Sequence, residues 1–443
     1  MSSTRSNRER AILVGLEIKG RDRRGGELPQ FDNEESLDEL SVLAESAGAE
    51  VIERTVQVRD AVEAATLIGS GKLEELVAQA YATQADVVLF DRDLSPTQLR
   101  NLEKVLPCKV LDRTQLILDI FARRARTREG QLQVELAQLS YLLPRLAGRG
   151  ATMSRLGGGI GTRGPGETQL ETDRRQIFTR ISKIKQDLES VRAGRGIQRR
   201  QRQSVPLATV SLAGYTNAGK STLFNRLTGA DVLADSKMFA TLDPVVRQFV
   251  LPSNRRVLLS DTVGFISNLP TTLVKAFRAT LEEVKEAALI LHVVDASSLH
   301  APQHTAHVMQ VLTDIEATGS PQLLVLNKTD LLPEREIDAE SVRLRVLGNI
   351  ASIEEAPGAV IVSARTGEGF DRLLKRIDDL LPVDPLTTNR FRIPHQDGAS
   401  MHLLYEYARV IEKKEGEEYS EVLAETPQSV LRQLAQYAVK ADT

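Results

Sequence analysis

The first hundred residues alternate short apolar runs with stretches whose apolar positions recur at helical spacing. The apolar runs, which predict strands, are residues 11–18, 51–58, 87–90 and 109–111. The helical spacing covers residues near 37–47, 72–82 and 96–105. This alternation predicts a small α/β domain over residues 1–112.

Apolar residues then recur in alternating steps of four and three along two further stretches. The first set is Leu132, Leu136, Leu139, Leu143 and Leu146. The second set is Ile177, Ile181, Ile184, Leu188 and Val191. A glycine-rich loop at residues 148–166 separates them, so the pattern predicts an antiparallel helical hairpin paired along both apolar seams. We assign residues 113–203 to this hairpin, with a glycine- and glutamine-rich joint after Arg195.

The composition is that of an ordinary globular protein. The 443 residues are 41% hydrophobic and 26% charged, a length that fits about three domains. The single cysteine, Cys108, cannot form an intrachain disulfide, which is typical of a reducing compartment. The apolar start at residues 11–16 is broken by Glu17 and Lys19, and no apolar run approaches the length of a membrane span. These features predict a soluble, cytoplasmic protein.

The basic residues are concentrated in the predicted hairpin. The whole chain has 57 basic and 60 acidic residues, whereas residues 113–203 hold 19 basic and 8 acidic ones. Arg149, Arg155 and Arg163 lie among the loop glycines, where amides and guanidinium groups can approach phosphates closely. This asymmetry indicates a basic module that faces a polyanion. The alternatives are a solvated helical surface and a flexible linker.

The strongest chemical signal follows the apolar strand pattern of residues 207–213. It is the run Gly214, Tyr215, Thr216, Asn217, Ala218, Gly219, Lys220, Ser221 and Thr222. A helical stretch comes next, and strand, glycine-rich turn and helix in this order are the full phosphate-loop pattern. Backbone amides at the helix start cradle phosphates, Lys220 neutralises the β- and γ-phosphates, and the Ser221 hydroxyl binds Mg²⁺.

Further residues complete the predicted chemistry around the γ-phosphate. A second apolar strand pattern ends at Asp261, whose carboxylate orients the Mg²⁺ shell through water, and the Gly264 amide can meet the γ-phosphate. Between the two motifs, the hydroxyl of Thr241 is the candidate switch ligand for Mg²⁺, with Ser236 as the alternative. Lys220, Thr241 and Gly264 are therefore the candidate catalytic residues.

A third strand pattern ends in Asn327, Lys328 and Asp330, which indicate the base. The Asp330 carboxylate has two acceptor oxygens that match the N1–H and N2–H₂ donors of guanine. Adenine lacks this donor pair and would leave a buried carboxylate unpaired. Ser363 and Ala364 follow the next strand pattern, where backbone amides can contact the guanine carbonyl. These elements predict GTP as the nucleotide.

The motifs assign residues 204–384 to a P-loop GTPase domain built on a doubly wound, mostly parallel sheet. Residues 385–443 predict a small C-terminal α/β appendage. Directly after Gly264 comes Phe265, where many switch GTPases have a glutamine that orients the attacking water. Because an aromatic ring cannot polarise water, we expect slow intrinsic hydrolysis that is stimulated in trans.

The run GGGIGTRGPGETQLETDRR at residues 157–175, ahead of the phosphate loop, closely resembles the HflX family of translational GTPases. Residues 239–244 and 261–266 resemble the switch segments of that family, and residues 69–76 its N-terminal signature. The resemblance implies a GTPase that binds the large ribosomal subunit and its RNA through residues 113–203. It further implies that the protein splits stalled or idle ribosomes under stress and that hydrolysis resets it.

Asn217 occupies the phosphate-loop position that resembles the K⁺-coordinating asparagine of cation-dependent GTPases. K⁺ is therefore a candidate cofactor beside Mg²⁺. The alternative is an asparagine that hydrogen-bonds its own backbone.

The histidines predict little chemistry. His300, His304 and His307 have helical spacing, but no cysteine or obvious fourth donor accompanies them, so we expect no metal site there. His292 lies inside an apolar run and is predicted to be a hydrogen-bonded core residue.

A function of another class stays open, because the hairpin could be the coiled-coil docking surface of a protein-binding signalling switch. GTP-regulated RNA modification or unwinding would need a catalytic constellation outside the GTPase domain, and the sequence offers none. The run Gly69 to Lys72 is not a second phosphate loop, because Thr66 replaces the first glycine and Leu73 the following Ser or Thr. Nothing demands a dimer, so we expect a monomer.

Overall fold

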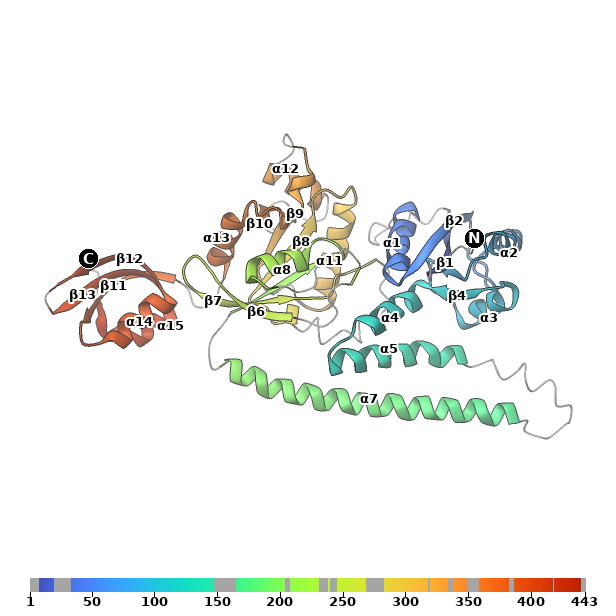
Figure 1. The fold of residues 1–443 in the computed structure, drawn as a ribbon, viewed down its shortest axis with the longest axis horizontal. Helices are drawn as coiled ribbons and strands as arrows, with labels where there is room; N and C mark the ends of the chain where they lie inside the picture. Colours follow the sequence, from blue (N-terminus) through green and yellow to red (C-terminus); the bar gives the residue numbers. More distant parts are fainter. Residues whose placement is uncertain are drawn as a thin grey trace, which may run out of the picture. The chain divides into compact units, whose positions relative to one another are not determined.

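The computed structural model describes residues 8–19, 33–146, 165–203, 208–230, 238–239, 245–267, 283–317, 319–333, 338–348, 358–381, 386–416 and 418–439. The chain divides into two units. The first unit comprises residues 1–196, 235–243 and 266–279, and the second residues 197–234, 244–265 and 280–443. Three separate sheets and their helices are drawn in Figure 1.

The first unit is built on a parallel sheet with the strand order β2-β1-β3-β4. Its strands are β1 (Glu9–Ile18), β2 (Ala49–Arg59), β3 (Val87–Phe90) and β4 (Lys109–Asp112). Its first helices are α1 (Asn33–Ser46), α2 (Ser70–Thr83) and α3 (Pro96–Val105). Strands β1 and β3 are buried on both faces, as expected of inner parallel strands. The α/β class predicted from the alternating pattern is therefore confirmed.

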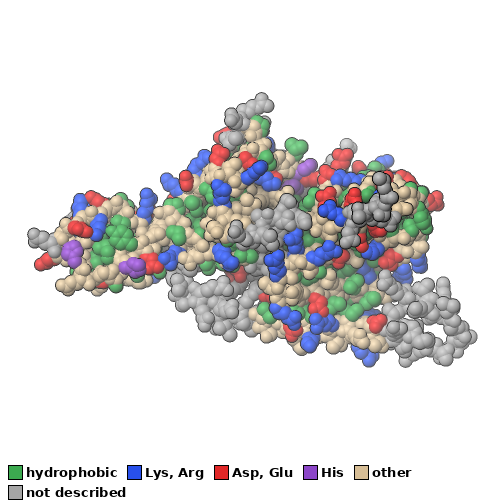
Figure 2. Space-filling model, in the orientation of Figure 1, with side chains coloured by type: hydrophobic (Ala, Val, Ile, Leu, Met, Phe, Trp, Pro, Cys, Tyr) green, Lys and Arg blue, Asp and Glu red, His purple; other side chains and the backbone are tan. Residues whose placement is uncertain are grey.

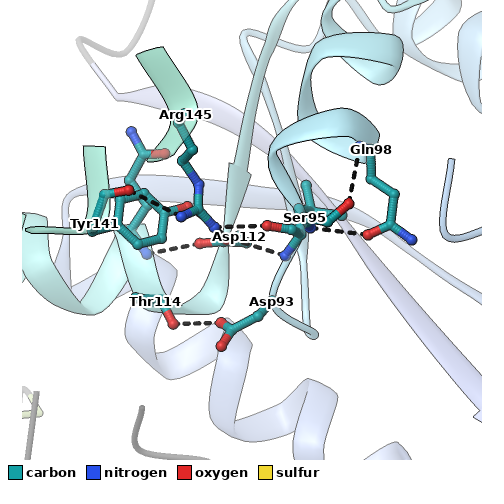
Figure 3. Close-up of polar contacts among 9 residues, drawn as sticks. Asp93, Ser95, Gln98, Asp112, Thr114, Tyr141 and Arg145 are labelled. Atoms are coloured by element: carbon teal, nitrogen blue, oxygen red, sulfur yellow. Dashed lines mark hydrogen bonds and ion pairs between the residues drawn. The ribbon is translucent and has the colours of Figure 1, made fainter. Parts of the chain in front are cut away.

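Helix α3 shows how local chemistry starts an element. The Ser95 hydroxyl accepts from the Gln98 amide at 3.2 Å, and the Gln98 side-chain oxygen accepts from the Ser95 amide at 2.9 Å (Figure 3). This reciprocal capping box, with Pro96 in the first turn, begins the helix. Leu99 and Leu102 then pack into the core of the sheet.

Three further helices follow β4: α4 (Arg113–Arg124), α5 (Arg128–Leu146) and α7 (Pro165–Gln203). Leu132 of α5 packs against Ile184 and Leu188 of α7, and both Nε and Nη2 of Arg180 donate to Glu135, at 2.6 and 2.7 Å. Residue numbers rise along one helix as they fall along the other, so α5 and α7 run antiparallel, side by side (Figure 1). The predicted hairpin pairing is confirmed.

The end of the hairpin differs from the prediction. Helix α7 continues to Gln203, through residues 195–203, where the glycine and glutamine content predicted a joint. The many arginine and glutamine residues of this stretch have good helix propensity, which outweighs the single glycine, Gly196. The glycine-rich loop falls mostly in residues 147–164, outside the described residues.

The second unit contains a six-stranded sheet with the order β10-β9-β8-β5-β7-β6. Its strands are β5 (Thr209–Gly214), β6 (Val245–Val250), β7 (Arg256–Asp261), β8 (Leu289–Asp295), β9 (Gln322–Asn327) and β10 (Gly358–Ile361). All neighbours pair in parallel except β6 with β7. The doubly wound, mostly parallel sheet is therefore confirmed.

Helices cover both faces of this sheet, and the strand alternation shows it. The helices are α8 (Lys220–Thr228), α11 (Ala301–Asp314), α12 (Ala339–Leu347) and α13 (Phe370–Leu380). Along β9, Leu323 and Val325 join one core cluster with residues of α8 and α13, whereas Leu324 and Leu326 join another with residues of α11 and α12. Strand β9 is thus apolar on both sides, which explains its continuous hydrophobic run.

The C-terminal part of the second unit forms an antiparallel sheet with the order β12-β13-β11-β14. Its elements are β11 (Leu386–Pro394), α14 (Gly398–Tyr407), β12 (Arg409–Glu415), β13 (Tyr419–Pro427), α15 (Gln428–Gln433) and β14 (Ala438–Val439). Phe391, Leu404 and Val422 are fully buried in its core. Across the part of the chain that is described, no helix has both the length and the apolar character to cross a membrane.

Candidate nucleotide-binding site

The loop after β5 lies at the carboxyl edge of the central sheet, where α/β proteins place their ligands. Its backbone turns sharply, with φ of +60° at Asn217 and +93° at Gly219. A Cβ on Gly219 would overlap the side-chain nitrogen of Asn327, and one on Gly214 would overlap the carbonyl oxygen of Val293. Glycine is therefore required at both ends of the loop, and α8 begins directly after it at Lys220.

Lys220 is a buried cation within this loop. Its side-chain nitrogen donates to the carbonyl oxygens of Gly214 at 3.0 Å and Tyr215 at 2.7 Å. Burial lowers the pKa of Lys220 to about 8, and the nearby Asp261 carboxylate opposes part of this shift. A phosphate placed at the loop would supply the counter-charge that such a desolvated ammonium lacks.

Ser221 and Asp261 bring two oxygen donors together from different elements. The Ser221 hydroxyl, at the start of α8, donates to Asp261 Oδ2 at 2.8 Å. Asp261 is fully buried at the last position of β7. Mg²⁺ prefers oxygen ligands and is commonly held by one or two protein groups together with phosphate oxygens. The donor set at this point fits such an ion. Thr222, the next residue of α8, is exposed.

The segment after Asp261 folds against the phosphate loop. The Thr216 amide donates to the Phe265 carbonyl at 2.7 Å, and the Phe265 amide donates to the Gly214 carbonyl at 3.1 Å. A Cβ on Gly264 would lie 2.9 Å from Thr216 Cγ2 and 3.0 Å from Lys220 Nζ. Phe265 is itself buried, so its ring packs inside the protein. The structure thus brings Gly264 beside the predicted phosphate-binding lysine.

Asn327 ties the base-recognition segment to the phosphate loop. Its side-chain nitrogen donates to the Ala218 carbonyl at 2.8 Å, and its side-chain oxygen accepts from the Ala364 amide at 2.9 Å. Asn327 is buried at the end of β9. The Asn327 side chain therefore fixes three loops of the predicted site, its own and those that contain Ala218 and Ala364. This structural role adds to the base-recognition role that the motif predicts for it.

The remaining base-recognition residues also lie together. The Ser363 hydroxyl donates to Asp330 Oδ1 at 2.7 Å, and Asp330 is exposed. Lys328, with φ of +64°, pairs with Asp295 at 2.7 Å, which fixes its stem beside the loop. The carboxylate predicted to read guanine is therefore held at one oxygen and open to an incoming base.

A stacked pair beside the phosphate loop was not predicted. The Tyr215 ring stacks on His304 of α11, with ring centroids 3.8 Å apart and planes 14° apart, and His307 meets the Tyr215 edge. Burial lowers the pKa of His304 to about 4, so this ring is neutral at physiological pH. The histidine spacing was visible in the sequence, but its aromatic partner comes from the loop after β5, about ninety positions earlier. Among the described residues there is no group of three or more His, Cys, Asp or Glu side chains placed to hold a metal ion.

Other expectations have mixed outcomes. Thr241 and Ser236, the two candidate switch ligands, lie outside the described residues, as do the loop arginines at positions 149, 155 and 163.

His292 is buried, but its Nδ1 has no hydrogen-bond partner in the described part of the chain. The prediction of a hydrogen-bonded histidine is wrong for this nitrogen. Burial lowers the pKa of His292 to about 3, so the ring stays neutral and tolerates the apolar surroundings.

Comparisons with known proteins cover most of the chain. Family models match as GTP-binding GTPase N-terminal over residues 34–122, GTP-binding GTPase Middle Region over 124–202 and 50S ribosome-binding GTPase over 209–328. GTPase HflX of Caldanaerobacter subterraneus subsp. tengcongensis is 44% identical over 439 residues, 99% of this chain and 96% of that protein. GTPase HflX of Escherichia coli is 45% identical over 386 residues, 87% of each. A solved GTP-binding protein from Sulfolobus solfataricus in complex with GDP is 23% identical with a TM-score of 0.45, covering 84% of this chain and 98% of that one.

Proposed function

The chain belongs to the GTPase HflX family, and from this premise we propose that it binds the large ribosomal subunit and splits stalled or idle ribosomes. The protein is a P-loop GTPase that hydrolyses GTP. In the proposed cycle the GTP-bound form binds and separates the subunits, and hydrolysis resets the protein for release. We place this activity in a stress response.

For the nucleotide we propose roles that follow the geometry. Amides of residues 214–219 and the start of α8 hold the phosphates, and the buried Lys220 neutralises their charge. Gly264, already beside Lys220, donates its amide to the γ-phosphate. Ser221, with Asp261 acting through water and Thr241 from the switch segment, would hold Mg²⁺. When bound, that ion shields the phosphate charge during transfer.

For the base, we propose that the two carboxylate oxygens of Asp330, of which Oδ1 also accepts from the Ser363 hydroxyl, accept from the N1–H and N2–H₂ groups of guanine. Asn327 holds the two loops in register, and Lys328 flanks the base. Amides at Ser363 and Ala364 donate to the guanine carbonyl. Support comes from the hydrogen bonds that already fix Asn327 and Asp330 in these positions.

The catalytic step is proposed to depend on a trigger outside the chain. Phe265 is buried and has no polar atom on its side chain, so it cannot orient the attacking water. Ribosomal RNA or protein would then supply the missing positioning. K⁺ at Asn217, which is exposed with a positive φ, is a second proposed contributor. Equal GTPase rates in K⁺ and Na⁺ at fixed ionic strength would remove K⁺ from the mechanism.

For the ribosomal partner we propose the basic hairpin, residues 113–203. The exposed basic residues on the described part of α7 are Arg174, Arg175, Arg180, Lys183 and Lys185, of which Arg180 pairs with Glu135. Figure 2 shows Lys and Arg side chains along this helix with Asp and Glu among them. Cationic groups that neutralise RNA phosphates make binding fall steeply with salt. A protein partner that binds the hairpin with weak salt dependence would favour a signalling role instead.

Ribosome splitting itself can be measured by light scattering. Intact ribosomes are mixed with the protein and a non-hydrolysable GTP analogue, and the scattering falls as subunits separate. We expect a rapid fall with the wild-type protein and none with Lys220→Ala, which keeps the hairpin but loses the phosphate contact. Unchanged scattering with a fully nucleotide-loaded wild-type protein would contradict the proposal.

A further inference from the structure

Arg113, the first residue of α4, is buried in the first unit between two carboxylates. Its Nη1 donates to Asp91 Oδ1 at 2.8 Å, and its Nη2 forms an ion pair with Glu39. The Ser36 hydroxyl donates to the other oxygen of Asp91 at 2.6 Å. The Arg113 side chain is 2% exposed and each carboxylate side chain 9%. This cluster joins α1, the residue after β3 and the start of α4.

Ser267 is the fourth member of the same cluster. Its hydroxyl accepts from Arg113 Nη2 at 2.8 Å and donates to Glu39. Ser267 is fully buried, and so is Ile266 before it. Residues 266–279 belong to the first unit, yet Ser267 follows Gly264 by only three positions. The cluster therefore binds the chain at Ser267, three residues after Gly264, the glycine that lies beside Lys220.

A second segment of the first unit is held by the same helices. The Met238 amide donates to the Ser46 hydroxyl, in the last turn of α1, at 3.1 Å. The Phe239 ring packs edge-on against Phe121 of α4, with ring centroids 4.5 Å apart. Phe239 comes two residues before Thr241. Helices α1 and α4 thus contact residues 238–239 and residues 266–267. These two segments lie next in the sequence to Thr241 and Gly264, the residues proposed to act at Mg²⁺ and the γ-phosphate.

The residue before Arg113 connects in the opposite direction. Asp112 caps α4 by accepting from the Gln115 amide at 2.9 Å. It also accepts from the Tyr141 hydroxyl at 2.7 Å and from Arg145 at 3.3 Å, both on α5 (Figure 3). Burial and the Asp112 charge raise the pKa of Tyr141, which keeps its hydroxyl a donor. The dipeptide Asp112–Arg113 thus contacts hairpin helix α5 through Asp112 and Ser267 through Arg113.

We propose that Arg113 and Glu39 are positioning residues for the segment that follows Gly264. We further propose that Asp112, through its contacts with α5, couples the conformation of this hairpin helix to these two residues. We call Arg113, Glu39 and Ser267 the clamp. The segment has to respond to the γ-phosphate if the Gly264 amide binds it. GTPases order their switch segments through contacts with the γ-phosphate and release them on hydrolysis, and contacts that hold one of these two arrangements more strongly give the protein different affinities for GTP and GDP. The clamp therefore sets the nucleotide preference without touching the nucleotide.

A matched pair of serines separates this role from a structural one. Removing Arg113 would leave two buried carboxylates without their cation, and such a variant would fold poorly. Ser267→Ala leaves Arg113 paired with both acids and removes the hydroxyl that joins the segment to Arg113 and Glu39. Ser36→Ala removes a hydroxyl of the same kind from Asp91, inside the same cluster, and leaves the link intact.

The measurement is the ratio of the dissociation constants for GDP and for a non-hydrolysable GTP analogue. We expect Ser267→Ala to change this ratio about fivefold or more, and Ser36→Ala to change it less than about twofold. Melting temperatures should fall in both variants, and further in Ser267→Ala, because the Ser267 hydroxyl makes two buried hydrogen bonds and the Ser36 hydroxyl one. Equal ratios in the two variants, whether both shifted or both unshifted, would overturn the clamp.

The link to the hairpin is tested with the same ratio. Tyr141→Phe removes the hydroxyl that donates to Asp112, and Tyr81→Phe changes an exposed tyrosine of α2 as its control. We expect Tyr141→Phe to shift the ratio about twofold in the wild-type chain and to add nothing in the Ser267→Ala chain, where the route is already cut. Additive shifts, or no shift from Tyr141→Phe alone, would overturn the link.

Discussion

Two loops of this protein carry glycine and lysine at the start of a helix, and their backbones differ. Gly69 precedes α2 with φ of −69°, and Lys72 pairs with its helix neighbour Glu75 at 2.9 Å. Gly219 precedes α8 with φ of +93°, and the buried Lys220 donates to two loop carbonyls. The same residue types therefore adopt different backbones, and of these two loops the second has the conformation, closed around a desolvated cation, that the proposed phosphate site requires.

The largest effect on GTP turnover should come from replacing Lys220 by alanine, and the same replacement of Lys72 is the matched control. We expect Lys220→Ala to reduce GTP turnover about 10³-fold, because a preorganised cation at the phosphates is lost. Lys72→Ala should change turnover less than about twofold, since only a helix-surface ion pair is lost. Steady-state hydrolysis of both variants checks this. An equal loss in both would mean that the N-terminal loop also binds nucleotide.

The loop before α8 is accompanied by predicted base-recognition residues, whereas the loop before α2 is not. The substitution Asp330→Asn tests the role of these residues. Asparagine presents one acceptor and one donor, which match the N1–H and the carbonyl oxygen at C2 of xanthine. We expect GTP affinity to fall about 10²-fold and xanthosine triphosphate to bind in its place. Competition against labelled GDP measures both. Lost affinity for GTP without any gain for the xanthine nucleotide would show that Asp330 only supports the fold.

Alanine at the two glycines compares the backbones directly. Gly219→Ala places a Cβ at positive φ against Asn327, so about 2 kcal/mol of strain should weaken GDP binding about 30-fold. At Gly69 the new Cβ would meet the far end of the Arg59 side chain, which can move. We expect Gly69→Ala to leave GDP affinity unchanged in a titration. Normal affinity in Gly219→Ala would contradict the strained-loop interpretation.

The pH dependence of binding should show the desolvated lysine itself. In the nucleotide-free protein Lys220 loses its proton as the pH rises through about 8, and a bound phosphate raises that pKa again. Binding above this pH then requires proton uptake, so GDP affinity should fall about tenfold between pH 7 and 9. Lys220→Arg keeps its charge over this range and should give a flat profile. A flat wild-type profile would place Lys220 outside the phosphate contact.

Much of the fold could be predicted because the local pattern and the tertiary packing agree. The buried runs of β5, β8 and β9 read as inner parallel strands since both faces are covered, and the α5–α7 pairing follows the leucine and isoleucine spacing. The end of α7 was missed because glycine content alone signalled a joint. The site motifs were found because they depend on chain-local spacing that phosphate and base contacts impose.

The remaining features depend on residues that meet only in the folded chain. The stack of Tyr215 on His304 joins a loop to a helix about ninety positions later, and the contacts of Arg113 with Ser267 span an even longer separation. No periodicity encodes such a contact. A buried arginine at the start of an ordinary amphipathic helix also carries no local mark that distinguishes it from an exposed one.

The most direct test of the account is GTP hydrolysis by the protein alone and with purified large ribosomal subunits, with Lys220→Ala in parallel. The account predicts slow hydrolysis alone, strong stimulation by the subunits, and loss of both in the variant, because the phosphate-loop motif is followed by Phe265 where many switch GTPases have the water-orienting glutamine. Tight GTP binding without any stimulation, or stimulation that survives Lys220→Ala, would contradict it.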